Sequence, residues 1–60
     1  MRKFRIDNYG LFSQIFDVEM KTWYGWTLVK RFRAESSDPF EIEYAKRLAE
    51  ELLEKLEEKL

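Results

Sequence analysis

The last third of the chain repeats apolar residues at helical spacing, and this pattern constrains the fold more than any other. At 100° per residue, one stripe of residues 39–60 is apolar, while the charged residues lie mostly outside it. Asp38 is placed to cap such a helix, Pro39 suits its first position, and Glu41 stands where a capping-box partner belongs. The sequence therefore predicts one long amphipathic helix over residues 39–60 that docks through its stripe. The stripe consists of Ile42, Ala45, Leu48, Ala49, Leu52, Leu53, Leu56 and Leu60.

The residues before this helix supply a sheet for it to dock against. Apolar and polar residues alternate over 2–8, 12–22 and 26–33, which is the period of half-buried strands. Gly10 provides a positive φ for the first turn and Gly25 for the second, where we expect a type I turn that ends in a G1 bulge. We therefore expect an α+β fold in a single domain. It consists of a three-stranded antiparallel meander sheet followed by one long C-terminal helix packed on one face.

Charge indicates how the strands are paired. A second hairpin centred on Tyr24 sets Asp17 opposite Arg31, and the first hairpin brings Arg5 to the other side of Asp17. Opposite charges on neighbouring strands attract, so both hairpins favour the same choice of faces. The remaining predicted pairs are Ile6 with Phe16, Phe4 with Val18, Lys3 with Glu19, Phe16 with Phe32, and Met20 with Leu28.

Lys30 interrupts the alternation of the third strand. Either a bulge near Leu28 and Val29 turns Val29 inward, or Lys30 lies at the margin of the helix and extends its amine to solvent. We favour the bulge. The side chains predicted to form the core are Phe4, Ile6, Phe16, Val18, Met20, Trp26, Leu28, Phe32, Ala45, Leu48, Leu52 and Leu56.

The composition excludes most catalytic chemistry. The chain has no Cys and no His, so it contains no disulfide, no thiolate or imidazole ligand for a metal, and no Ser–His or Cys–His pair. The glutamates of the helix alternate with Lys and Arg, as on a solvated helix face. We expect no catalytic residue, no cofactor and no bound metal, and hence no enzyme. We also expect no signal peptide or membrane span, and a soluble protein that is cytoplasmic if natural or recombinantly expressed.

Two surfaces are candidates for binding a partner: the outer face of the sheet and the aromatic tip of the second hairpin. Residues 1–35 carry seven Lys/Arg and four Asp/Glu, a net charge of +3, whereas residues 36–60 carry −4. This basic excess is small for a nucleic-acid binder, and Asp17 and Glu19 interrupt it, so a charge-paired face is the stronger hypothesis. The candidate residues are Lys3, Arg5, Lys21, Trp23, Tyr24, Thr27, Arg31 and Arg33.

Three resemblances accompany this interpretation. The helix entry Ser-Asp-Pro-x-Glu and the ending Leu-Leu-Glu-Lys-Leu-Glu-Glu-Lys-Leu, within residues 36–60, resemble computationally designed βββα miniproteins. The turns Asn8-Tyr9-Gly10 and Lys21-Thr22-Trp23-Tyr24-Gly25-Trp26 are similar to those of small phage-type hairpin-plus-helix proteins. The architecture is also that of the plant ethylene-response-factor DNA-binding domain, without a residue-by-residue match to its strand motifs.

These observations lead to two functional hypotheses. The first is a structural scaffold, designed or engineered, without catalytic function. The alternative is a small binding module that uses the outer sheet face or the Trp23/Tyr24 tip for nucleic acid or a protein. Since a helix over residues 39–60 is longer than the strands, we also expect its last turn to overhang, which favours a homodimer through that end.

Overall fold

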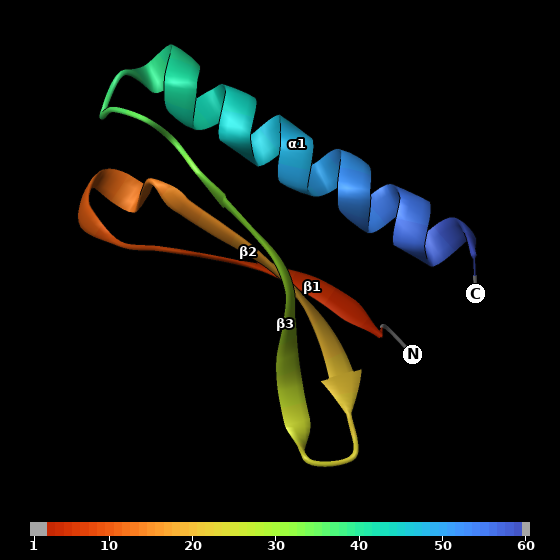
Figure 1. The fold of residues 1–60 in the computed structure, drawn as a ribbon. Helices are drawn as coiled ribbons and strands as arrows, with labels where there is room; N and C mark the ends of the chain where they lie inside the picture. Colours follow the sequence, from red (N-terminus) through yellow and green to blue (C-terminus); the bar gives the residue numbers. More distant parts are fainter. Residues whose placement is uncertain (1–2, 60) are drawn as a thin grey trace.

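Three consecutive strands form the sheet, and one helix follows them across one face (Figure 1). The structure is a computed structural model that describes residues 3–59. The strands are β1 (Phe4–Tyr9), β2 (Ile15–Thr22) and β3 (Gly25–Arg33), and the helix α1 spans Pro39–Glu58. Both strand pairs are antiparallel and the sheet order is β1-β2-β3. The predicted fold class is confirmed.

The entry to α1 follows the sequence signals with one difference. The Asp38 carboxylate accepts a hydrogen bond from the Phe40 N–H at 2.9 Å, and Pro39 occupies the first turn. In a capping box, the Glu41 side chain would accept the N–H of Asp38. Here that N–H donates to the Ser36 hydroxyl at 3.2 Å instead. The first turn is therefore capped by Asp38 and Ser36. The predicted helix end at Leu60 lies outside the described residues.

Small residues bring α1 close to the sheet. Ala45 and Ala49 are its buried residues, and they pack in one cluster with the fully buried Val18 and with Phe16. Ala34, which the sequence analysis did not place in the core, is buried in the same cluster. Larger side chains of the predicted stripe and of the strands surround it and are half-buried. Those packed against the cluster are Ile6, Phe32, Ile42, Leu52, Leu53 and Leu56.

The first turn is longer than predicted. Gly10 has the expected positive φ of 93°, but a short 3-10 segment, η1 (Leu11–Ser13), follows it, and β2 begins at Ile15 rather than at residue 12. The Asn8 amide donates hydrogen bonds to the carbonyls of Ser13 at 3.0 Å and Ile15 at 2.9 Å, which fixes the turn to β1.

The longer turn moves β1 by two residues along β2. Ile6 pairs with Val18 and Arg5 with Glu19, so the predicted pairing of this hairpin is wrong. Because the shift is an even number of residues, the faces of β1 are unchanged and Phe4 is still buried. The predicted ion pair between Lys3 and Glu19 is replaced by one between Arg5 and Glu19 at 2.8 Å.

The second hairpin contains the predicted bulge. Asp17 pairs with Arg31 and Phe16 with Phe32, as expected, but Glu19 pairs with Leu28 and the register shifts by one residue at Val29. The bulge is confirmed. It does not bury a side chain, because Val29 and Lys30 are both exposed.

The bulge reverses the faces of β3 between Gly25 and Leu28, because side chains alternate along a strand. Met20 pairs with Thr27 instead of Leu28, and Trp26 pairs with Lys21. Thr27 therefore lies on the helix side, whereas Trp26 and Leu28 lie on the outer face. The predicted burial of Leu28 and Met20 is wrong: they are 46% and 37% exposed.

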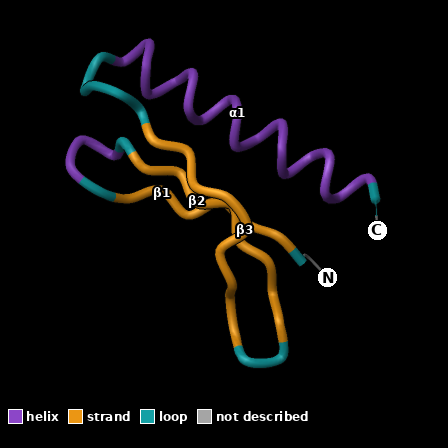
Figure 2. Tube along the Cα trace, in the orientation of Figure 1, coloured by secondary structure: helices purple, strands orange, loops and turns teal. Residues whose placement is uncertain are grey.

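The tip of the β2–β3 hairpin extends well beyond the helix. In Figures 1 and 2 the two strands leave the neighbourhood of α1 near their middle and point away from it. The helix consequently covers only the part of the sheet near Phe16 and Val18. Within the described residues 3–59, no helix combines the length and the hydrophobicity that a membrane span requires.

Candidate binding surface on the sheet

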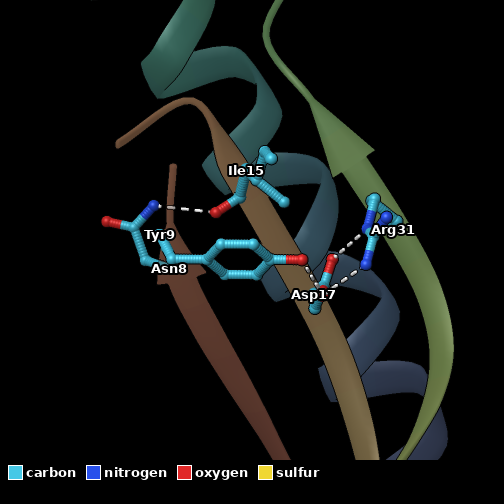
Figure 3. A network of polar contacts seen from close by, with 5 residues as sticks. All are labelled: Asn8, Tyr9, Ile15, Asp17 and Arg31. Carbon is cyan, nitrogen blue, oxygen red and sulfur yellow. Dashed lines mark hydrogen bonds and ion pairs between the residues drawn. The ribbon is translucent and has the colours of Figure 1, made fainter. Parts of the chain in front are cut away.

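A polar network occupies the centre of the outer sheet face (Figure 3). The Arg31 guanidinium donates to Asp17 through Nε at 2.8 Å and a second nitrogen at 3.2 Å. The Tyr9 hydroxyl reaches the same carboxylate from β1 and donates to it at 2.7 Å. Asp17 is only 4% exposed, although it lies on the face without the helix. Arg31 lies beside Asp17 as predicted, whereas Tyr9 takes the place of Arg5, the second arginine expected there, which pairs with Glu19 instead.

The network keeps Asp17 charged. The hydrogen bonds from Arg31 lower the pKa of the Asp17 carboxyl, and the bond from Tyr9 acts in the same direction, against the opposing effect of burial. The same contacts raise the pKa of the Tyr9 hydroxyl, chiefly through its bond to Asp17, and that of the Arg31 guanidinium. All three groups thus keep their ordinary charge states near neutral pH, which suits a structural clamp across three strands rather than an acid or base.

Asp17 should make the fold sensitive to acid. Because the folded-state pKa of its carboxyl is depressed, its contribution is present above the unfolded-state value and is lost as pH falls through the folded value. Asp17→Asn should lower the unfolding free energy at pH 7 by roughly 1–3 kcal/mol, since charge-assisted bonds to a buried carboxylate are lost. Urea denaturation at pH 7 and at steps below pH 4 measures both effects.

Asp7→Asn is the matched control for this prediction. Asp7 is exposed and lies opposite Asp17 on β1, so its neutralisation removes a like charge and should leave stability unchanged or slightly higher. Equal stability of the Asp17→Asn and Asp7→Asn variants at neutral pH would contradict the structural role of the network.

Trp26 organises the second part of the outer face. The Arg5 guanidinium lies 4.2 Å from its ring centroid and the Lys21 ammonium 5.3 Å, so two cations contact the indole. Arg5 is also held by the Glu19 carboxylate at 2.8 Å. The prediction that Trp26 belongs to the core is therefore wrong, since its ring lies on the outer face in contact with basic side chains.

The structure does not bring the predicted binding residues into one patch. Lys3 adjoins Lys21, whose N–H donates to the Lys3 carbonyl at 2.7 Å, while Arg33 pairs with Ile15 at the far end of the sheet. Thr27 lies on the opposite face, with its hydroxyl 3.5 Å from that of Thr22. The remaining predicted residues divide between the paired arginines, Arg5 and Arg31, and the hairpin tip, Trp23 and Tyr24.

The hairpin tip exposes two aromatic rings. Trp23 is 94% exposed and Tyr24 66%, and their rings meet edge to face with centroids 5.1 Å apart. Both residues keep negative φ, and Gly25 has the predicted positive φ, at 127°. Because Thr22 pairs with Gly25, the loop consists of Trp23 and Tyr24, so the prediction of a hairpin centred on Tyr24 with a G1 bulge at Gly25 is wrong. The Thr22 hydroxyl donates to the Gly25 carbonyl at 2.7 Å, which closes the turn. The two rings therefore project from a hydrogen-bonded turn with little other protein around them.

A second apolar tip was not anticipated. Leu11 and Phe12, in η1, are 76% and 63% exposed at the opposite end of the sheet. Leu11 had been assigned to the predicted turn and Phe12 to the predicted strand 12–22. Only their exposure in the structure, which is unusual for a Leu-Phe pair, singles them out. Their location makes this tip a natural comparison for the Trp23/Tyr24 tip.

The helix flanks contain two shallow hollows. One, of about 400 Å³, lies between β1 and α1 over Ile6, Phe16 and Ile42. The other, of about 240 Å³, lies beside Phe32 and Tyr44. Among residues 3–59 no group of three or more acidic side chains is placed to hold a metal ion.

Comparison with protein-family models, curated proteins and solved structures found no match to this chain.

Proposed function

We propose that this chain is a small noncatalytic recognition module, in which the sheet and helix form a scaffold and the β2–β3 hairpin presents Trp23 and Tyr24 to a protein partner. The observation that supports it is the exposure of Trp23, which is 94% accessible at the end of a hairpin that extends past the helix. In a protein that served only as a scaffold, a large apolar side chain exposed to solvent would add nothing to stability.

The chemistry of the tip defines the kind of partner. Trp and Tyr carry much of the binding energy at protein interfaces when they enter a desolvated pocket, and they have few side-chain torsions to immobilise. Residues 20–29 contain a single charged residue, Lys21, and no acidic one. The complementary surface is therefore an apolar pocket with carboxylates at its rim.

The charge pairing of the outer face weighs against the nucleic-acid alternative. Arg5 is paired with Glu19 and Arg31 with Asp17, each at 2.8 Å, so a carboxylate that would repel phosphate lies beside each guanidinium. Phosphate contacts supply most of the affinity of nonspecific nucleic-acid binding. A labelled duplex titrated by fluorescence anisotropy at low salt should accordingly show no tight binding by the parent.

The proposal is tested by selecting binders from a displayed peptide library and measuring their affinity for variants. Trp23→Ala/Tyr24→Ala should lose at least about tenfold, because truncation of an interface anchor typically costs more than about 1–2 kcal/mol. The substituted side chains are exposed, so circular dichroism and the melting temperature should remain near those of the parent.

Leu11→Ala/Phe12→Ala is the matched control, since it removes two exposed apolar side chains from the other tip. Its affinity for the selected peptides should equal that of the parent. Selected peptides that bind the Trp23→Ala/Tyr24→Ala variant as tightly as the parent would refute the proposal.

A further inference from the structure

The two outer strands of the sheet, β1 and β3, have free edges that differ in how they are protected. β3 carries three Lys/Arg and no acid, and a bulge at Val29 interrupts it. Charges of one sign and bulges are features that keep an exposed edge from pairing with another strand. β1 has neither: its register with β2 is regular, and it carries one base, Arg5, and one acid, Asp7. The edge of β1 is therefore open to a further strand.

The unpaired backbone groups of β1 belong to Phe4, Ile6 and Asn8. The Lys21 N–H donates to the Lys3 carbonyl at 2.7 Å, and hydrogen-bonded pairs alternate along an antiparallel ladder, so the odd-numbered residues of β1 bond to β2. The N–H and C=O groups of the even-numbered residues then point to the free edge, where no other part of the described chain bonds to them. Such an edge binds a strand that presents backbone groups with the same alternation.

We infer that the strand that pairs with this edge is β1 of a second copy, antiparallel and centred on Ile6. In this register Ile6 meets its own counterpart, and Arg5 of each copy lies opposite Asp7 of the other. Every residue with outward backbone groups meets another such residue, as the hydrogen-bond ladder requires. The same contact is made twice about a twofold axis, so the assembly closes as a dimer in which the strands of both copies form one sheet. This contact differs from the homodimer through the helix end that the sequence favours.

Charge selects this register over its neighbours. Moving the centre by one residue is the smallest shift that keeps the outward backbone groups facing each other, and it sets Arg5 against Arg5 or Asp7 against Asp7. Like charges directly opposite each other destabilise a strand pair. Asp7 already lies opposite Asp17 in its own chain and has no ion pair among residues 3–59. Arg5 bonds to Glu19 through Nε alone, so the other nitrogens of its guanidinium remain as donors for Asp7 of the second copy.

The dimer leaves room for both helices. The twofold axis is normal to the sheet, so the two copies of α1 lie on the same face. In each copy Ala45 and Ala49 cluster with Val18 of β2, and the two β2 strands are three strand spacings, about 14 Å, apart. Packed helices need only about 8–10 Å between their axes. The half-buried Ile6 of each copy then lies at the axis, beside the hollow of about 400 Å³ that it shares with Ile42, and reduces the exposure of the other.

Sedimentation equilibrium at up to about 1 mM protein tests the inference, a concentration that detects association of millimolar affinity or better. The parent should be dimeric at the upper end of this range. Asp7→Lys should raise the dissociation constant at least about tenfold, because it sets a lysine against Arg5 in both halves of the contact. The fold should not suffer, since this lysine lies opposite Asp17 and replaces a like charge by an opposite one. Glu35→Lys, the same charge change at an exposed residue just after β3, should leave the dissociation constant unchanged.

A single introduced cysteine tests the register, since the chain has none of its own. Ile6 meets its counterpart as a hydrogen-bonded pair, whose Cα atoms lie about 5.5 Å apart, within the range that a disulfide spans. In a glutathione redox buffer, Ile6→Cys should therefore form at least about tenfold more disulfide-linked dimer than Val29→Cys, which places the thiol at an exposed position of the other outer strand.

A parent that stays monomeric at about 1 mM would overturn the inference. A dimer as tight in Asp7→Lys as in the parent, or equal cross-linking of the two cysteine variants, would overturn the assigned contact. Trp23 and Tyr24 lie outside β1, so Trp23→Ala/Tyr24→Ala should remain dimeric. Failure of this inference is therefore separable from failure of the proposed recognition function.

Discussion

Phe16→Ala should remove a large part of the stability of the fold. Phe16 is 4% exposed in the cluster where β2 meets Ala45 and Ala49 of α1. Truncating a buried Phe costs about 3–5 kcal/mol, through lost burial and the cavity that remains. A domain of this length has a total stability of roughly 3–9 kcal/mol. Urea denaturation followed by circular dichroism should therefore show an unfolding free energy lower than that of the parent by about 3–5 kcal/mol, a large part of the total.

Leu28→Ala provides the comparison for this result. Leu28 was predicted to belong to the same core, but it is 46% exposed on the outer face. Its truncation should cost well under half as much as that of Phe16, since far less burial is lost. Similar losses at both positions would show that the bulge at Val29 is absent and that the predicted faces of β3 were right.

Gly10→Ala should be the most damaging of the glycine substitutions. Gly10 has φ 93° and ψ 174°, a conformation that is essentially restricted to glycine and costs other residues about 1–3 kcal/mol. An added Cβ would also lie 3.1 Å from Cδ1 of Ile15, at the start of β2. Strain and crowding therefore act together, and the melting temperature should fall by several degrees or more.

Gly25→Ala separates the two causes. Gly25 also has a positive φ, of 127°, but no atom lies within 4 Å of an added Cβ. The substitution at Gly25 should therefore produce backbone strain alone and a smaller loss than at Gly10. A larger loss at Gly25 than at Gly10 in thermal denaturation would contradict the described conformation of the first turn.

The helix and the strand order were predictable because their signals are local. Apolar residues at helical spacing, an Asp-Pro pair at the start of a helix and alternation along a strand each depend on residues only a few positions apart. The structure contains the helix and the strands that these signals predict. The length of the first turn was not predictable, because Leu11 and Phe12 carry no turn signal and Phe12 adopts a positive φ of 57° that an aromatic residue rarely takes. The pairing of β1 depended on the length of that turn.

Trp26 was assigned to the wrong face of the sheet for a different reason. The interruption at Lys30 correctly indicated a bulge, but a bulge also reverses every side chain on its far side, and the predicted core kept Trp26 and Leu28 on the helix side. The exposure of the tip residues could be suspected from the sequence. The divergence of hairpin and helix, which leaves Met20 uncovered, arises from the three-dimensional arrangement and has no local signal.

The central claim is that the β2–β3 tip, and not the outer face, makes the contact with a partner. Single-tryptophan variants test it directly. Trp26→Phe leaves Trp23 as the only indole, and Trp23→Phe leaves Trp26, which is half-buried under Arg5 and Lys21. In the free protein, acrylamide should quench Trp23 far more readily than Trp26.

Titration with a selected peptide then shows whether Trp23 or Trp26 contacts the partner. The Trp26→Phe protein should show a blue shift of Trp23 emission and protection from acrylamide as the ring enters an apolar pocket. The Trp23→Phe protein, if it still binds, should show neither change at Trp26. Protection of Trp26 while Trp23 stays fully quenchable would contradict the account and assign the contact to the outer face.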